Sequence, residues 1–270
     1  MGGSTLGLDW KANMTTKAQK NKSSLFYINL FFLTCLLTVG VISGFIVPPE
    51  SIEPNIANAL CAASLEHPFG CDIYGADVLG QIILGTRTSL YIAVVSVIIS
   101  FAIGTFLGLI SGFYGGALDY FVCRIIDVFM AFPGILLAMS IAALLGPSLN
   151  NIIIAISLTG WTASARLVRG QVLTIKELDY ISATRSLGAS HSRIVWKHIL
   201  PNIFPQLIIT GSFALAGVIL TEASLSFLGF GAQDNTYASW GSLLNQGRDV
   251  LFEAPHLSII PGLLIFLLVF

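Results

Sequence analysis

The side chains that could do chemistry gather in one stretch, residues 176–203, which reads KELDYISATRSLGASHSRIVWKHILPNI. This stretch holds acids, bases, hydroxyls and two of the four histidines, in a chain of which only 10% of the residues are charged. Such groups can bind a partner through hydrogen bonds and ion pairs, or they can form a catalytic centre. The spacing of the residues decides between the two.

Catalytic and metal-binding patterns are absent from the sequence. It contains no Gly-x-x-x-x-Gly-Lys-Ser/Thr phosphate loop, no His-Glu-x-x-His and no Cys-x-x-Cys pair. No nucleophile, base and orienting group can be assembled, so we expect no catalytic residue, no cofactor and no metal site on this chain. The net charge of -1 does not decide for or against nucleic acid, and no nucleic-acid partner is expected. The four histidines are scattered: His67, His191, His198 and His256.

The four cysteines do not make a disulfide scaffold in a chain of this length. Cys35 and Cys123 lie in or beside apolar runs and are most simply packing residues. Cys61 and Cys71 share one polar segment, where an oxidising compartment would allow them to pair. The alternative is two free thiols, and the sequence leaves both open.

Composition places the chain in a lipid bilayer. Hydrophobic residues make up 55% of it and the mean hydropathy is +0.84, whereas soluble domains carry about a quarter charged residues. Because a helix needs about 20 apolar residues to cross the hydrocarbon, we expect an all-α polytopic membrane protein with about six transmembrane helices. A sixth span is expected to be incomplete, since the residues from Ile259 to Phe270 reach only about 18 Å. The spans are predicted at 25–47, 89–112, 121–145, 150–168, 203–228 and 257–270.

The distribution of lysine and arginine predicts the orientation. With residues 1–24 as a cytoplasmic tail and 48–88 as an external segment, the inner segments hold eleven of the thirteen basic residues. Only Arg87 and Arg248 fall outside. The long first apolar run favours an uncleaved anchor over a cleaved signal peptide. We therefore expect a multi-pass protein of the cell (inner) membrane with its N-terminus in the cytoplasm. The inner basic residues are Lys11, Lys17, Lys20, Lys22, Arg124, Arg166, Arg169, Lys176, Arg185, Arg193 and Lys197.

The polar stretch itself predicts a helix, a turn and a second helix. Leu178, Ile181 and Leu187 favour one face of a short helix, and Gly188 breaks it. Ser190 or Ser192 can cap the next helix, which is predicted to stop around Pro201. One interpretation is an amphipathic segment whose basic residues meet anionic lipid. The other is a docking element that a groove in a partner protein grips.

The same residues resemble a known signature. The loop of binding-protein-dependent ABC importer permeases reads Glu-Ala-Ala, three residues, Gly, nine residues, Ile, one residue, Leu-Pro. Here the frame reads Ser182-Ala183-Thr184, Gly188, His198 and Leu200-Pro201. The spacing, the glycine and the closing Leu-Pro match. Ser182 replaces the acidic residue, Thr184 an alanine and His198 an isoleucine.

Other segments resemble the dipeptide, oligopeptide and nickel branch of this family. HPFGCDIYGADVLGQIILGTRTSL, residues 67–90, is similar to the segment that leads into the second helix of those permeases. RIIDVFMAFPGILLA at 124–138 resembles their third helix. ILTEASLSFLGFG at 219–231 and SWGSLL at 239–244 resemble the stretch after their fifth. The chain is thus similar to the second-type membrane subunit of such importers.

The resemblance implies an ABC type I importer transmembrane domain over 86–270, with a cytoplasmic coupling loop at 169–202. It implies a homologous permease subunit, two ATP-binding subunits that hold ATP and Mg, and an extracytoplasmic solute-binding protein. The substrate implied is a peptide or nickel, and the sequence does not choose between dipeptide, longer peptide and nickel. The implied coupling residues are Tyr180, Ser182, Ala183, Thr184, Leu187, Gly188, His198, Leu200 and Pro201.

Three residues within predicted spans are candidates for a translocation path or for structure. Glu222 is costly in an apolar span, and its alternative role is a helix-end carboxyl bound to Ser224 or a neighbouring helix. Asp127 is more simply an ion pair with Arg124. Pro133 permits a kink that could shape a path or only affect packing.

Two other classes of membrane protein are less consistent with the sequence. An ion-driven secondary transporter usually places ionisable residues or broken helices at mid-membrane, whereas this interior is nearly free of charge. An intramembrane enzyme would need a catalytic constellation at depth. The polar residues lie instead in the predicted cytoplasmic loop.

Overall fold

A computed structural model describes residues 52–231 and 238–269, with isolated residues at 34, 38–40, 42–43 and 47. The predicted tail 1–24 and most of the predicted first span 25–47 lie outside these residues. Within the described part the protein is helical, and its only β-type pairing is an isolated bridge between Cys71 and Asp77. The elements are a 3-10 turn Ile56–Asn58, α2 Val78–Tyr114, α3 Gly116–Met130, α4 Gly134–Leu145, α5 Leu149–Ile175, α6 Asp179–Ser186, α7 His191–Ile194, a π-helical turn Val195–Ile199, α8 Leu200–Phe227, α9 Trp240–Asp249 and α10 His256–Val269.

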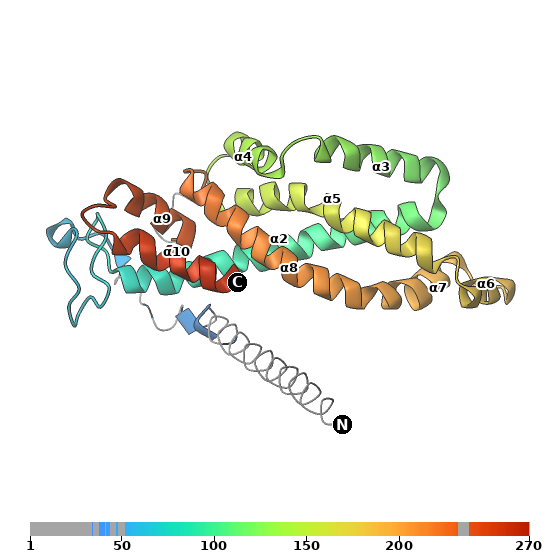
Figure 1. The fold of residues 1–270 in the computed structure, drawn as a ribbon, viewed down its shortest axis with the longest axis horizontal. Coiled ribbons are helices and arrows are strands. Elements are labelled where there is room, and N and C mark those ends of the chain that lie inside the picture. The colour runs from blue at the N-terminus through green and yellow to red at the C-terminus, as the bar shows by residue number, and fades with distance from the viewer. Residues whose placement is uncertain are drawn as a thin grey trace, which may run out of the picture.

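Helices α2 and α5 form the centre of the bundle and pack closely along their lengths (Figure 1). Glycines on α2 make this approach possible, because a residue without a side chain lets two helix backbones come close together. A methyl carbon added at Gly108 would lie 2.6 Å from the carbonyl oxygen of Ala165, and one at Gly112 would lie 2.9 Å from Cβ of Val172. Larger side chains at these positions would therefore push the two helices apart.

The predicted span 121–145 is two helices rather than one. Helices α3 and α4 are bent by 86° at a short break, and Pro133 is the N-cap residue of α4. Proline has no N–H to donate, and it disfavours helical backbone in the residue before it, so the chain turns there. The kink expected at Pro133 is confirmed. The bend is so large that residues 121–145 form two helices, and the prediction of one span there is corrected.

Helices α2, α5 and α8 are longer than the spans predicted for them at 89–112, 150–168 and 203–228. Helix α2 begins at Val78, so residues 78–88 belong to this helix and not to an irregular external segment. Helix α8 is continuous with the π-helical turn and α7, giving one helix from His191 to Phe227. The predicted stop at Pro201 is therefore wrong, because the wider π-helical turn directly before Pro201 accommodates its ring and the helix continues to Phe227. Helix α9, which follows Ser239, was not predicted.

Among the described residues, three helices are long and apolar enough to cross a membrane, or four if α3 and α4 together make one span. These helices expose many large apolar side chains, and α8 exposes the most. Of its most apolar window only 11% is buried, against 44% for α2 and 56% for α5. Lipid or another apolar surface must cover such faces.

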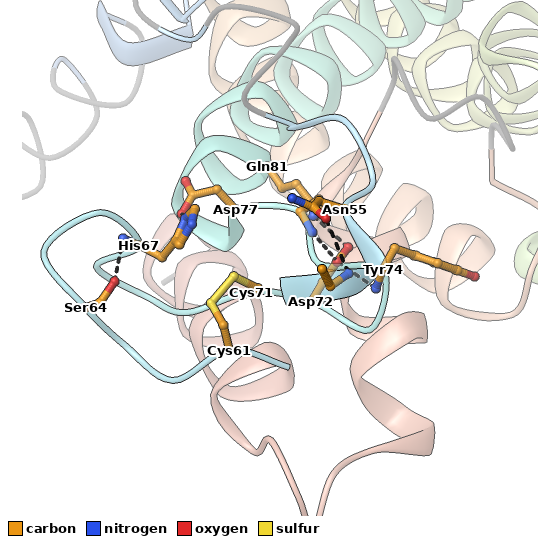
Figure 2. The surroundings of a disulfide bond; sticks show 11 residues. Asn55, Cys61, Ser64, His67, Cys71, Asp72, Tyr74, Asp77 and Gln81 are labelled. Atoms are coloured by element: carbon orange, nitrogen blue, oxygen red, sulfur yellow. Dashed lines mark hydrogen bonds and ion pairs between the residues drawn. A yellow bond between two sulfur atoms is a disulfide. The ribbon is translucent and has the colours of Figure 1, made fainter. Parts of the chain in front are cut away.

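The two ends of the elongated bundle differ in structure (Figure 1). Residues 52–77, α9 and the start of α10 lie together at one end, and α6 projects from the other. Figure 2 shows that Cys61 and Cys71 form a disulfide in the first of these ends. The pairing that the sequence left open is therefore present in the structure.

Candidate functional site

The candidate site is the projecting segment between α5 and α8. Helix α5 ends at Ile175, and the Lys176 ammonium donates a hydrogen bond to the Gly112 carbonyl at 3.0 Å. Helix α6 then begins at Asp179 and ends at Ser186. Gly188 has a φ of +79°, which is the left-handed backbone that glycine adopts without strain. The helix, glycine turn and second helix predicted from the sequence are confirmed.

Ser190 is the N-cap residue of the second helix, α7. It is one of the two residues, Ser190 or Ser192, that the sequence predicted for this role. Its hydroxyl accepts a hydrogen bond from the backbone N–H of Arg193 at 3.4 Å. Ser190 thereby satisfies a donor that the first helical turn leaves unpaired. The path of the chain out of the glycine turn is set by local residues.

One buried face holds α6 to the bundle. Ile181 is fully buried, and it belongs to an apolar cluster with residues of α2, α5, α7 and the start of α8. Burial of each such side chain is favourable by about 1.5–3 kcal/mol, which anchors the short helix. The cluster is Leu109, Val168, Val172, Ile175, Ile181, Ile194, Ile199 and Ile203.

The opposite face of α6 is open. Leu187 is 88% exposed, and Ser182 and Ala183 are also exposed. Tyr180 is 42% exposed, and Thr184 is half-buried with its hydroxyl donating to the Tyr180 carbonyl at 2.7 Å. A helix that is anchored by one face and exposes apolar and hydroxyl-bearing side chains on the other can bind in a groove of a partner protein.

The remaining predicted residues of the loop lie where α6 returns to α8. His198 is in the π-helical turn, and Leu200 and Pro201 start α8. Asn202, which was not singled out from the sequence, connects the two parts. Its side-chain nitrogen donates to the His198 carbonyl at 2.6 Å and to the Tyr180 hydroxyl at 3.1 Å. Only the fold shows that residues 22 positions apart meet here.

The three candidate residues outside the loop lie in separate places. Asp127 pairs with Arg124 at 3.8 Å, as predicted, and also with Arg166 of α5 at 3.3 Å. Pro133 is at the break between α3 and α4. These two do not join the projecting segment. A second link from α3 to α5 is the bidentate pair of Arg169 with Asp119.

Glu222 is fully buried where α2, α8 and α9 meet. The Ser89 hydroxyl donates to its Oε2 at 3.1 Å, and the Ser226 hydroxyl donates to its Oε1 at 2.8 Å. The predicted partner Ser224 bonds instead to the Leu220 carbonyl, whereas the predicted bond to a neighbouring helix is confirmed through Ser89 of α2. The backbone N–H of Trp240 reaches the same Ser89 hydroxyl at 3.4 Å. This carboxyl therefore joins three helices.

One cluster has the residue types of a metal site. Ligand atoms of Cys61, His67 and Cys71 lie within 4.8 Å of one another. The two sulfurs are bonded to each other, so neither is available as a thiolate ligand. His67 contacts Asp77 at 3.1 Å, and Asp72 accepts hydrogen bonds from the Ala76 N–H and the Gln81 amide (Figure 2). These contacts order the segment before α2.

Comparison with known proteins gives three findings. The family model described as the inner membrane component of binding-protein-dependent transport systems matches residues 104–270. The dipeptide transport system permease protein DppC of Alkalihalophilus pseudofirmus is 37% identical over 93% of this chain and 82% of its own length. The glutathione transport system permease protein GsiD of Pectobacterium atrosepticum is 43% identical over 76% of this chain and 68% of its own.

A solved structure shares the fold. The MetNI methionine ABC transporter, in an inward-facing conformation, matches 70% of this chain and 90% of its own chain with a TM-score of 0.59 at 23% identity. At that level of identity the match concerns the arrangement of helices alone.

Proposed function

This chain belongs to the family of inner membrane components of binding-protein-dependent transport systems, and we propose that it is the membrane-spanning permease of an ATP-driven importer of peptides. The names of its relatives, which are permeases for dipeptides and for glutathione, support peptides as the cargo. The protein is a multi-pass protein of the inner membrane. It works as a transport subunit, with no catalytic residue of its own.

One observation carries the ATP-driven part of the proposal: α6 projects from one end of the bundle with an anchored face and an open face. Its exposed residues follow the spacing of the family's signature loop. Separate ATPase subunits grip this face, and they hold ATP and Mg. When nucleotide closes the two ATPases, α6 moves with them, and the bundle changes from inward-open to outward-open.

The other partners follow from the surfaces that remain. A homologous permease covers part of the exposed apolar face of α8, and lipid covers the rest. A solute-binding protein delivers the peptide at the end formed by residues 52–77 and α9. The N-terminus and α6 lie on the cytoplasmic side, in agreement with the distribution of basic residues.

The proposal is tested by isolating the intact complex from native membranes in mild detergent through a tag on this chain. We expect a second permease and two ATP-binding subunits to copurify, and the reconstituted complex to take up a labelled dipeptide only with ATP and the binding protein. Uptake without an ATPase, driven by an ion gradient, would show that the proposal is wrong.

A further inference from the structure

The link between α6 and α8 has an unusual local structure. Between α7 and α8 the chain forms a π-helical turn over Val195–Ile199, in which the N–H of Leu200 bonds to the carbonyl of Val195. Pro201 follows directly. In an ordinary α-helix its ring would press against the carbonyl of Lys197, four residues earlier, and a wider turn lies at this point instead. π-Helical turns are rare in proteins, and many of those that occur lie at functional sites.

The Asn202 side chain donates two hydrogen bonds beside this turn. Its amide nitrogen has two N–H donors. One goes to the His198 carbonyl at 2.6 Å, and the other goes to the Tyr180 hydroxyl at 3.1 Å. Because a carbonyl can only accept, the amide nitrogen and not the oxygen must face His198. The orientation of Asn202 is thus determined by chemistry.

This chain of two hydrogen bonds crosses from one helix to another. Tyr180 belongs to α6, next to the buried anchor Ile181, while Asn202 belongs to the first turn of α8 and His198 to the π-helical turn before it. The apolar cluster around Ile181 also holds α6, but apolar contacts have no preferred direction. The hydrogen bonds between Tyr180, Asn202 and the His198 carbonyl do have a preferred direction.

We propose that Asn202 is a positioning residue that transmits displacement of α6 to α8 through the Tyr180 hydroxyl and the His198 carbonyl. The inference rests on the proposed function, in which an ATPase grips α6. When the partner moves α6, the Tyr180 hydroxyl pulls on the Asn202 amide, and the π-helical turn supplies the backbone freedom for α8 to follow. Asn202 does not contact the cargo or the nucleotide in this role.

The experiment uses the complete importer in proteoliposomes, and it measures peptide transported per ATP hydrolysed together with the ATPase content of each preparation. Tyr180→Phe removes only the hydroxyl, and Asn202→Ala removes both donors. We expect each to lower the transport ratio by about two- to tenfold, which is the range for one neutral hydrogen bond. The double variant should be no worse than Asn202→Ala, because both changes break the same link.

Two further variants separate this role from general damage to the loop. Asn202→Asp keeps the shape but places an acceptor against the His198 carbonyl, so the ratio should fall at least as far as in Asn202→Ala. Ser140→Ala, outside the loop, removes a hydroxyl whose hydrogen bond, to the Leu136 carbonyl at 2.8 Å, stays within α4. This control should keep the wild-type ratio.

The possible outcomes distinguish failure of this inference from failure of the proposed function on which it rests. Wild-type ratios in Tyr180→Phe and Asn202→Ala, in a complex that contains its ATPases and transports peptide, would overturn the inference alone. Losses that multiply in the double variant would also overturn it, since the two residues would then act separately. A wild-type preparation that transports without an ATPase would overturn the proposed function.

Discussion

Residue 182 carries a neutral hydroxyl at the position where the resembled signature loop has a carboxylate. Ser182 is exposed in the first turns of α6, on the face that we assign to the ATPase partner. A carboxylate there would suit the positive end of the helix and lie one turn before Arg185. Within this chain, position 182 can therefore carry either a hydroxyl or a carboxylate.

The first prediction concerns this residue. Ser182→Glu should bind the ATPase subunit as tightly as the wild type, or up to about tenfold more tightly, because hydrogen bonds to charged groups are stronger than those between neutral groups. Titration of the purified ATPase against the permease in detergent measures the affinity. Ser186→Glu, at the other end of α6, is the matched control and should bring no gain. A clear loss in Ser182→Glu would show that the partner's groove is adapted to a neutral residue.

The hydrogen bonds of the buried Glu222 carboxyl indicate a structural role for it. Its two oxygens accept hydrogen bonds from Ser89 of α2 and Ser226 of α8, and Ser89 also receives the N–H of Trp240 at the start of α9. A buried carboxyl with a hydrogen bond to each oxygen can join helices within an apolar bundle. This favours the structural alternative over a place on the translocation path.

The second prediction follows from these contacts. Glu222→Leu should lower the free energy of unfolding by about 1–3 kcal/mol for each serine hydroxyl that it leaves unsatisfied. Replacing Ser226 by alanine in the same variant should restore part of the loss, because the Ser226 hydroxyl is then no longer left unpaired. Ser89 is kept, because its hydroxyl also accepts a hydrogen bond from the N–H of Trp240. Denaturation in detergent, followed by circular dichroism, measures both. The exposed Glu253→Leu is the control, and equal losses in the two variants would contradict the role assigned to Glu222.

At the scale of elements, the function depends on how short pieces are joined. The turn at Gly188 leads the chain from the end of α6 to α7, and apart from its two chain neighbours no heavy atom lies within 4 Å of a Cβ added at Gly188. A side chain at this position is therefore opposed by backbone strain and not by crowding. Asparagine tolerates such backbone, whereas a β-branched residue does not.

The third prediction uses this difference. Gly188→Asn should retain most ATPase binding, and Gly188→Val should lose about tenfold or more, from a strain of about 1–2 kcal/mol, while still inserting into the membrane. Gly229→Val is a strain-matched control, since Gly229 has a φ of +88°, equally open surroundings and a place at the end of α8 away from α6. It should keep ATPase copurification. Normal copurification and uptake in Gly188→Val would contradict the role of the turn.

At the scale of the whole molecule, the two ends of the bundle face different partners. The disulfide end and the α6 end lie at opposite extremes of the long axis (Figure 1). A disulfide is favoured in an oxidising compartment, and clustered basic residues are favoured in the cytoplasm. Both arguments give the same orientation.

The fourth prediction tests that orientation. Leu65 and Leu187 are 103% and 88% exposed at the two ends, so each can be replaced by cysteine without loss of packing. With Cys35 and Cys123 replaced by serine and the disulfide kept, an impermeant maleimide should label Leu65→Cys in spheroplasts, that is, in cells without an outer barrier. Leu187→Cys, in cells that lack the ATPase subunits, should react only after the membrane is opened. The reverse pattern would contradict a cytoplasmic α6.

Three features could be predicted from the residues alone: the membrane class, the helix, glycine turn and helix of the polar loop, and the Asp127–Arg124 pair. These depend on composition and on neighbours within a few residues, which local physics can predict. The bend at Pro133 also followed from sequence, because proline removes a backbone donor wherever it stands.

The contacts between residues far apart in the chain could not be predicted and are visible in the folded protein alone. The Cys61–Cys71 disulfide, the contacts of Glu222 with Ser89, and the bond between Asn202 and Tyr180 each join residues that the chain separates. Helix continuity through Pro201 was likewise decided by packing, because Ile199 and Ile203 on either side of it are buried against α5. Local pattern predicts an element, but burial and long-range hydrogen bonds determine where it continues and what it contacts.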